Sequence, residues 1–165
     1  MTNTADDLAA AEAAARALVV EGVRLCREGQ WQKGLDCLRE VAASSIDPAK
    51  LPGTFFSYLG YGMAHIHGRK EEGLKLCRRA IEIEFYQADN YYNLARMYLL
   101  LRRRKEAVDT IEEGLKVDPD HKDLNQLFDE IGQRREPVLR KMHRDHFLNR
   151  LLGKLRHDFA GKKQK

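Results

Sequence analysis

Histidine pairs are the residues of this chain whose type and spacing come closest to a metal site. His65 and His67 are two residues apart within a helical pattern, and side chains at this spacing point to different sides of a helix. His143 and His146 have a better spacing, with Asp145 beside them, but no carboxylate stands at the spacing of a further ligand. The sequence therefore predicts solvated polar faces at both pairs and no metal site.

Nucleophilic and phosphate chemistry also lack their usual motifs. Cys26, Cys37 and Cys77 form no C-x-x-C pair and leave one cysteine over, so we expect reduced thiols that pack as small apolar side chains. The sequence contains no Gly-rich phosphate loop, no Gly-x-Ser-x-Gly elbow and no His-Glu-x-x-His pattern. These observations predict a protein that is not an enzyme, holds no cofactor and takes no small-molecule substrate.

The clearest structural pattern lies between Ala88 and His121. Apolar and small residues recur at i, i+3, i+4 and i+7 on one helix face: Tyr91, Leu94, Ala95 and Tyr98. After a basic turn a second face follows: Ala107, Val108, Ile111, Gly114 and Leu115. Asp118-Pro119 then ends the helix, because proline cannot continue it. We expect the two helices to cross closely at the small residues Ala95 and Ala107.

This segment resembles a tetratricopeptide repeat. The order Tyr91-x-x-Leu94-Ala95-x-x-Tyr98, then Ala107-x-x-x-Ile111, then Pro119 is the order and spacing of that family. The layout recurs upstream, around Gly60 and Gly73 and again around Gly22 and Gly34. The resemblance implies an all-α fold, an α-α superhelix with three helix-turn-helix repeats at about 15–48, 53–87 and 88–121.

The array is expected to span residues 1–136. Helices are predicted near 6–28, 31–45, 54–67, 70–84, 88–101 and 104–117. A further helix at about 120–135, with Asp120 as its candidate N-cap, has an apolar face of Leu124, Leu127, Phe128 and Ile131. We expect it to cap the open end of the array.

Residues 137–165 form a separate, basic tail. From Arg134 to Lys165 there are eleven Lys or Arg and three acids, a formal charge of +8, which leaves −4 for the rest of a chain whose total is +4. Its apolar stripe consists of Leu148, Leu151, Leu152, Leu155 and Phe159. Its basic face includes Arg150, Lys154 and Arg156. The pattern predicts a basic amphipathic helix.

Three roles remain open for this helix. The helix could dock on the array of its own chain, or on that of a neighbouring chain, and the second arrangement would make a homo-oligomer. It could instead bind an acidic partner or lie on an anionic membrane. Docking is favoured because exposed apolar side chains are costly. Nucleic-acid binding is less favoured, since Phe147 and Phe159 are not interleaved with the basic residues as stacking platforms.

The N-terminal segment carries no pattern of a secretory signal. Asp6, Asp7 and Glu12 precede the apolar residues, and Arg16 interrupts the alanines. No stretch approaches the ~18 apolar residues that a membrane-spanning helix needs. The sequence therefore predicts a cytoplasmic protein.

A protein-binding groove is implied by the resemblance. In that family the first helix of each repeat lines a concave surface that holds a peptide or a partner helix. The helix positions outside the packing stripe would line it: Val19, Val23, Cys26, Ser57, Tyr61, His65, Tyr92, Arg96 and Leu99. Tyrosine suits such a surface, since it offers a large face and a hydroxyl at low entropy cost. The alternative is that Tyr61 and Tyr92 pack against the next repeat or the tail.

One subtype of the family is excluded by its missing residues. Co-chaperones that grip the C-terminal carboxylate of large chaperones use Lys and Asn on the groove helix of the first repeat, Asn on that of the second, and Lys or Arg on that of the third. The corresponding residues here are Val19, Val23 and Tyr58, with a cation only at Arg96. A more apolar ligand is expected.

The sequence as a whole predicts a non-enzymatic adaptor that binds a peptide or helix segment of another protein. Apolar side chains of the partner would contact Val23, Tyr61, Tyr92 and Leu99, and Arg96 would hold an acidic or carbonyl group. Two alternatives are a small three-repeat chaperone of the bacterial secretion type and a peripheral membrane or nucleic-acid protein that acts through the tail.

Overall fold

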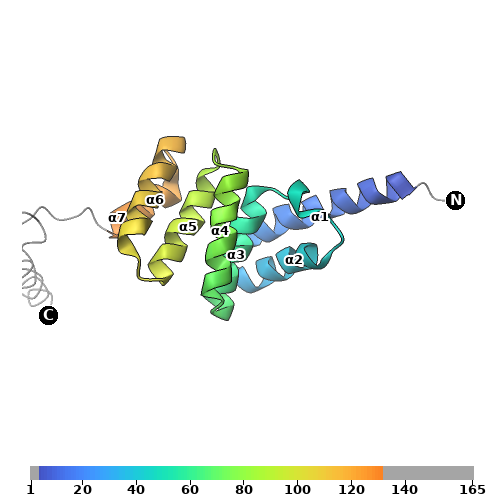
Figure 1. Ribbon diagram of the computed structural model, residues 1–165, viewed down its shortest axis with the longest axis horizontal. Coiled ribbons are helices and arrows are strands. Elements are labelled where there is room, and N and C mark those ends of the chain that lie inside the picture. The colour runs from blue at the N-terminus through green and yellow to red at the C-terminus, as the bar shows by residue number, and fades with distance from the viewer. Residues whose placement is uncertain (1–3, 132–165) are drawn as a thin grey trace, which may run out of the picture. The chain divides into compact units, whose positions relative to one another are not determined.

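The computed structural model describes residues 4–131, and these residues form helices and no strand (Figure 1). The helices are α1 (Thr4–Arg27), α2 (Trp31–Ala43), α3 (Gly53–His67), α4 (Lys70–Ile83), α5 (Ala88–Leu100), α6 (Arg104–Val117) and α7 (Lys122–Ile131), and a 3-10 turn, η1 (Pro48–Lys50), precedes α3. The predicted all-α fold is confirmed. Within the described part of the chain, no helix is long and apolar enough to cross a membrane.

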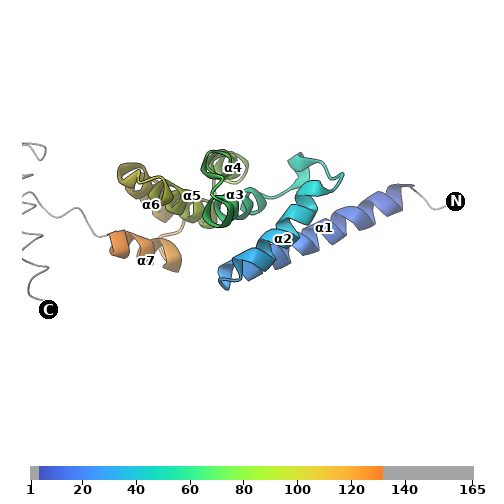
Figure 2. The same ribbon diagram turned by 90° about the horizontal axis from the view of Figure 1, so that it is seen from below.

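The helices pack as successive pairs. α1 packs on α2, α3 on α4 and α5 on α6, while α3 also contacts α2 and α5. Figure 2 shows these pairs following one another between α1 and α6. Because each pair contacts mainly its neighbours, the architecture is that of a helical solenoid.

Each turn inside a pair contains a residue with positive φ. Gly29 ends the first helix of its pair with φ 80° and Gly68 does so with φ 70°. Glycine adopts this left-handed region without the clash of a Cβ atom. The third pair has Arg102 there, with φ 58°. The backbone at Arg102 is therefore strained in a way that the two glycines are not.

The helices of a pair cross at small residues. A Cβ atom added to Gly60 would lie 2.7 Å from the carbonyl oxygen of Gly73, and one added to Gly73 would clash with the carbonyl oxygen of Gly60. In the third pair Ala95 and Ala107, which were expected at the crossing, are fully buried. The α3–α4 crossing is thus too close for any side chain larger than hydrogen.

The core runs along the array in two linked clusters. The first contains Leu35, Leu38 and Phe55, and the second contains Met97 among the side chains of α3 to α6. Trp31 packs against both clusters. Apolar burial therefore continues from one pair to the next, as stacked repeats require.

α7 covers the end of the third pair. Leu124 is fully buried, and a Cβ atom on Gly114 would lie 2.7 Å from its Cδ1 atom. The helix begins later than expected, and His121 rather than Asp120 caps it: His121 Nδ1 accepts a hydrogen bond from the Leu124 N–H (3.2 Å). The Asp120 N–H instead donates to Asp118 Oδ1 (3.2 Å) within the preceding turn. The prediction of Asp120 as N-cap is therefore wrong.

The described helices, up to Glu130, belong to one compact unit. The predicted basic tail at 137–165, with Arg150, Lys154 and Arg156, lies outside the described residues. Its three candidate roles stay predictions.

Candidate functional site

Arg96 of α5 lies among three aromatic rings. Its guanidinium carbon is 3.8 Å from the ring centre of Tyr61 on α3, and 5.1 Å from those of Tyr92 on α5 and Trp31 at the start of α2. The negative face of an aromatic ring attracts a cation at such distances. No carboxylate forms an ion pair with Arg96 within residues 4–131. The rings therefore hold this charge where three helices meet.

Tyr61 is the centre of this ring cluster, which consists of Trp31, Tyr61, His65, Tyr92 and Arg96. The Tyr61 ring meets Trp31 edge-on with 5.1 Å between ring centres, and it stacks on His65 at 5.4 Å. Tyr61 is 5% exposed, and burial raises the pKa of its phenol although the Arg96 charge opposes that rise. Tyr61 thus packs between helices, as the alternative interpretation of the sequence expected.

A polar network joins α1 to α5. Arg27 forms an ion pair with Asp89, and its Nε donates a hydrogen bond to the Tyr58 hydroxyl (3.0 Å). That hydroxyl donates to Asp89 Oδ1 (3.3 Å), and His121 Nε2 lies 3.5 Å from the same oxygen. Burial and the Asp89 carboxylate raise the pKa of Tyr58, so its hydroxyl remains a donor. The largely buried Asp89 carboxylate, at the start of α5, therefore contacts side chains from the end of α1, from α3 and from the residue before α7.

A cavity of about 260 Å³ lies between the ring cluster and this network. Its lining consists of Cys26, Arg27, Gly29, Trp31, Tyr58, Tyr92, Arg96 and Asp123. Arg27 already pairs with Asp89, and Arg96 already lies against three rings. Both cations of the lining are therefore engaged, whereas the Asp123 carboxylate forms no ion pair within residues 4–131.

A larger groove of about 880 Å³ runs beside α1, and we name it the α1 groove. It is lined by Arg16, Val19, Val20, Val23, Arg24, Arg27, Ala49, Lys50, Leu51, Pro52, Thr54, Ile83, Glu84, Tyr86 and Gln87. Val19, Val23 and Leu51 form its buried floor. By contrast Val20 is 69% exposed and Tyr86 is 61% exposed. The α1 groove therefore has an apolar floor, and Val20 and Tyr86 make part of its rim apolar as well.

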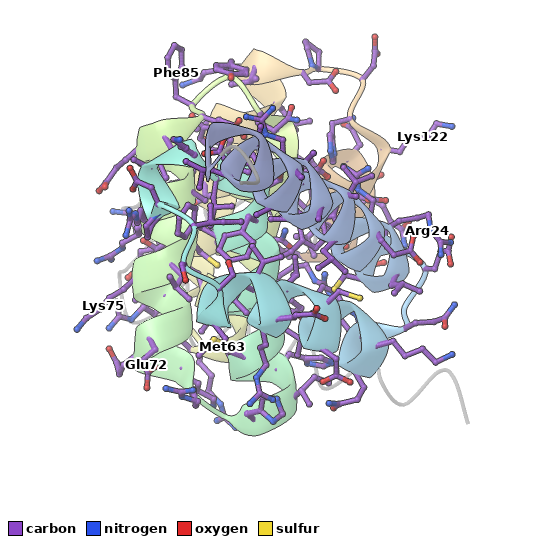
Figure 3. All side chains as sticks on the ribbon, turned by 90° about the vertical axis from the view of Figure 1, so that its right-hand side faces the viewer. Arg24, Met63, Glu72, Lys75, Phe85 and Lys122 are labelled. Carbon is purple, nitrogen blue, oxygen red and sulfur yellow. The ribbon has the colours of Figure 1, made fainter. Side chains whose placement is uncertain are left out.

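A second exposed ring adjoins the α1 groove. Phe85, on the connection between α4 and α5, is 67% exposed and meets Tyr86 edge-on with ring centres 5.7 Å apart. Figure 3 shows Phe85 projecting at the edge of the array and Arg24 projecting from α1. Single exposed apolar side chains are common, but two adjacent rings beside an apolar groove are typical of an interaction surface.

The structure distributes the predicted groove residues among different places. Val19 and Val23 line the α1 groove, while Cys26, Tyr92 and Arg96 line the smaller cavity. Tyr61 and His65 belong to the ring cluster, and Leu99 packs half-buried against the second core cluster. Their roles in binding stay predictions.

Ser57 does not belong to any groove. It is fully buried, and Asn93 Nδ2 donates a hydrogen bond to its hydroxyl (3.3 Å). The structure therefore corrects the assignment of Ser57, which holds α3 to α5 inside the core.

Sequence reasoning missed Val20, Ile83 and Tyr86 of the α1 groove. One signal was available, because Glu84 to Gln87 reads EFYQ where a repeat of this type is expected to end in proline. Phe85 and Tyr86 lie in a short connection outside the helices, so no side chains of their own helix pack over the two rings. Such a pair is a candidate for an exposed contact surface.

Comparison with known proteins identifies the repeat. A family model described as tetratricopeptide repeat matches residues 88–121, the segment from which the resemblance was inferred. No curated protein sequence matches the chain. The solved structures that it resembles include tetratricopeptide-repeat domains.

Three of these structures share 16–18% identity with this chain, which shows a common fold. The Arabidopsis OM64 TPR domain has a TM-score of 0.58 at 17% identity, over 73% of this chain and 95% of that one. The first TPR of Spaghetti (RPAP3), bound to the HSP90 peptide SRMEEVD, has a TM-score of 0.55 at 16% identity, over 72% and 90%. The second TPR domain of human RPAP3, in complex with the HSP70 peptide SGPTIEEVD, has a TM-score of 0.53 at 18% identity, over 73% and 99%.

Proposed function

We propose that this chain, in which residues 88–121 match the tetratricopeptide repeat, is a non-enzymatic adaptor that binds a segment of another protein in the α1 groove. The observation that carries the proposal is the groove itself, about 880 Å³ in volume with Val20, Ile83 and Tyr86 exposed at its rim. Covering such side chains contributes about 25 cal/mol for each Å² of apolar surface removed from water. A partner segment gains this contribution without displacing any helix of the array.

The ring cluster has a supporting role in this proposal. Arg96 was expected to hold an acidic or carbonyl group of the ligand, but its guanidinium lies 3.8 Å from the Tyr61 ring centre. A ligand would have to compete with three ring contacts for that charge. We therefore assign the cluster to fixing α2, α3 and α5 relative to one another, which keeps the α1 groove in shape.

The two RPAP3 domains hold peptides of HSP90 and HSP70, which supports a peptide segment as the class of ligand. The position expected to carry a polar clamp residue on α3 is Tyr58, whose hydroxyl is engaged by Arg27 and Asp89. Val19 and Val23 offer no donor on α1. These residues favour an apolar ligand.

Photo-cross-linking at single positions tests the proposal. A photoreactive amino acid at Val20 or Tyr86 should give discrete protein adducts in a cell lysate, because both positions are exposed in the groove. The matched control is Lys75, which Figure 3 shows on the outer side of α4. Equal adducts from Lys75, or adducts at Val20 that persist after Tyr86→Ser together with Ile83→Ser, would contradict the proposal.

A chain that ends at Glu136 separates the groove from the tail. Its adducts at Val20 should match those of the full chain at low and at moderate salt. Adducts that need residues 137–165 and disappear with added salt would assign the function to the basic tail instead.

A further inference from the structure

The charged residues that line the α1 groove are mostly cationic. Arg16, Arg24, Arg27 and Lys50 line it, against one carboxylate, that of Glu84. Charges at the rim of an apolar site select and orient partners of opposite sign and accelerate their encounter. The positive charge around the α1 groove therefore favours a partner that carries negative charge.

Not all four cations are equally available to a ligand. Arg27 is committed to Asp89 and Tyr58 inside the array. Arg16 is exposed and forms no ion pair in the part of the chain that the structure describes. It can therefore contact a partner without losing an internal one.

Arg24 and Lys50 each form ion pairs within the array. Arg24 pairs with Glu21 and Glu28 on its own helix, and about half of each of these side chains is exposed. Lys50 pairs with Glu12. The exposed pairs of Arg24 contribute little to stability, so a partner carboxylate can share this cation at small cost.

From this arrangement we infer that the partner is an apolar segment flanked by Asp or Glu, a conclusion that rests on the proposed function of the α1 groove. Its apolar side chains cover Val20, Ile83 and Tyr86, and its carboxylates lie against Arg16 and Arg24. No C-terminal carboxylate is required, because the cations are spread along α1. The acidic residues are side chains within the segment.

Selection from a random peptide library on the immobilised full chain tests this inference. Peptides that are retained by the full chain but not by the Val20→Ser/Tyr86→Ser variant report on the α1 groove. These peptides should contain at least two large apolar residues and an excess of Asp and Glu over Lys and Arg. Their affinity should fall as salt rises from low to moderate concentration.

Charge variants then ask whether Arg16 and Arg24 select the acids. For one selected acidic peptide, Arg16→Glu with Arg24→Gln should weaken binding about tenfold, equivalent to ~1.4 kcal/mol. Lys75→Glu, on α4, changes the net charge by the same amount as Arg16→Glu alone and should leave the affinity unchanged. Arg16→Glu alone should also weaken binding of this peptide. Because Arg16 forms no internal ion pair in the described residues, this variant should fold normally.

The outcomes separate the inference from the proposed function. Peptides that depend on Val20 and Tyr86 but show no acidic excess, or that bind the charge variant equally well, overturn the inference and leave the adaptor function standing. A library that yields no peptide dependent on Val20 and Tyr86 overturns both.

Discussion

Arg27 and Asp89, 62 residues apart, form an ion pair that ties the end of α1 to the first turn of α5. The carboxylate is only 11% exposed, whereas the Arg27 side chain is 52% exposed. α1 itself packs on α2 and α3. The pair is therefore a direct side-chain link between the first and third helix pairs, and its Arg27 also lines the small cavity beside the ring cluster.

Removing this link should destabilise the array. Asp89→Ala should lower the free energy of unfolding by about 2–3 kcal/mol, because it leaves the buried Tyr58 hydroxyl without its acceptor and Arg27 without its partner. In a double-mutant cycle with Arg27→Ala, urea unfolding should give a coupling of about 1 kcal/mol. Glu112→Ala, on the exposed side of α6, is the control and should change stability by less than about 0.5 kcal/mol. A coupling near zero would mean that the pair does not hold α1 to α5.

The α3–α4 crossing should not tolerate a methyl group. Gly60→Ala places its Cβ 2.7 Å from the Gly73 carbonyl oxygen, so the helices must separate. We expect a loss of about 2 kcal/mol or more from this overpacking. The reverse change in the third pair, Ala95→Gly, should cost only about 1 kcal/mol through helix propensity. Calorimetry that ranks Ala95→Gly as the more damaging variant would contradict this reading of the two crossings.

The helix pairs could be predicted from the sequence because their signals are local. In α5 the spacing of Tyr91, Leu94 and Tyr98 reports which side of one helix is apolar, and each of these residues is buried. The burial of Ala95 and Ala107 also followed from residue size at two positions. The prediction of the helix pairs used only the spacing of residues in adjacent helical turns.

The groove could be predicted only in part, because it depends on contacts far apart in the sequence. The spacing rule gave α3 one packing face and one groove face, yet Phe55 to Ala64 are all buried, so Ser57 had no open face to occupy. The continuous apolar run FFSYLGYGMA is itself typical of a helix buried on all sides. The contact of Arg96 with Trp31 has no local signal, since it depends on how α2 and α5 approach each other.

Arg102 offers a route to a more stable chain. Its φ of 58° is unfavourable for a side chain, while the equivalent turns use Gly29 and Gly68. Arg102→Gly should raise the free energy of unfolding by roughly 0.5 kcal/mol, the relief of strain less the extra flexibility of the unfolded chain. Glu112→Gly, at an exposed position in the interior of α6, should instead lower it by about 1 kcal/mol. A lower melting temperature for Arg102→Gly would show that the left-handed turn is not strained.

Buried thiols should make the array less stable in alkali. Burial raises the pKa of Cys26 to about 12 and that of Cys77 to about 12. A thiol in the unfolded chain titrates near ~8.5, so above that pH the unfolded state loses protons that the folded state keeps. Stability is therefore full below about pH 8.5 and falls as pH rises toward 12, by at most about 1.4 kcal/mol per thiol and pH unit.

Urea unfolding between pH 8 and 9 measures this effect before unfolded tyrosines, which titrate near ~10, contribute. Cys77→Ala should reduce the slope of stability against pH by about half, because one of two buried thiols is gone. Leu74→Ala, buried on the same helix, should lower stability at every pH without changing the slope. An unchanged slope in Cys77→Ala would mean that this thiol ionises in the folded chain.

Variants of the α1 groove should lose binding without losing stability, and this separates them from the ring cluster. Val20→Ser and Tyr86→Ser alter side chains that are 69% and 61% exposed, so each should change the free energy of unfolding by no more than about 0.5 kcal/mol. Tyr61→Ala removes a ring that is 5% exposed and packed on Trp31, His65 and Arg96, at a cost of about 3 kcal/mol or more. Loss of a partner in Tyr61→Ala would thus report unfolding of the scaffold, whereas loss in Val20→Ser at unchanged melting temperature would report the contact itself. If Val20→Ser keeps the partner and a stable variant of Tyr92 loses it, the binding surface lies at the ring cluster and not in the α1 groove.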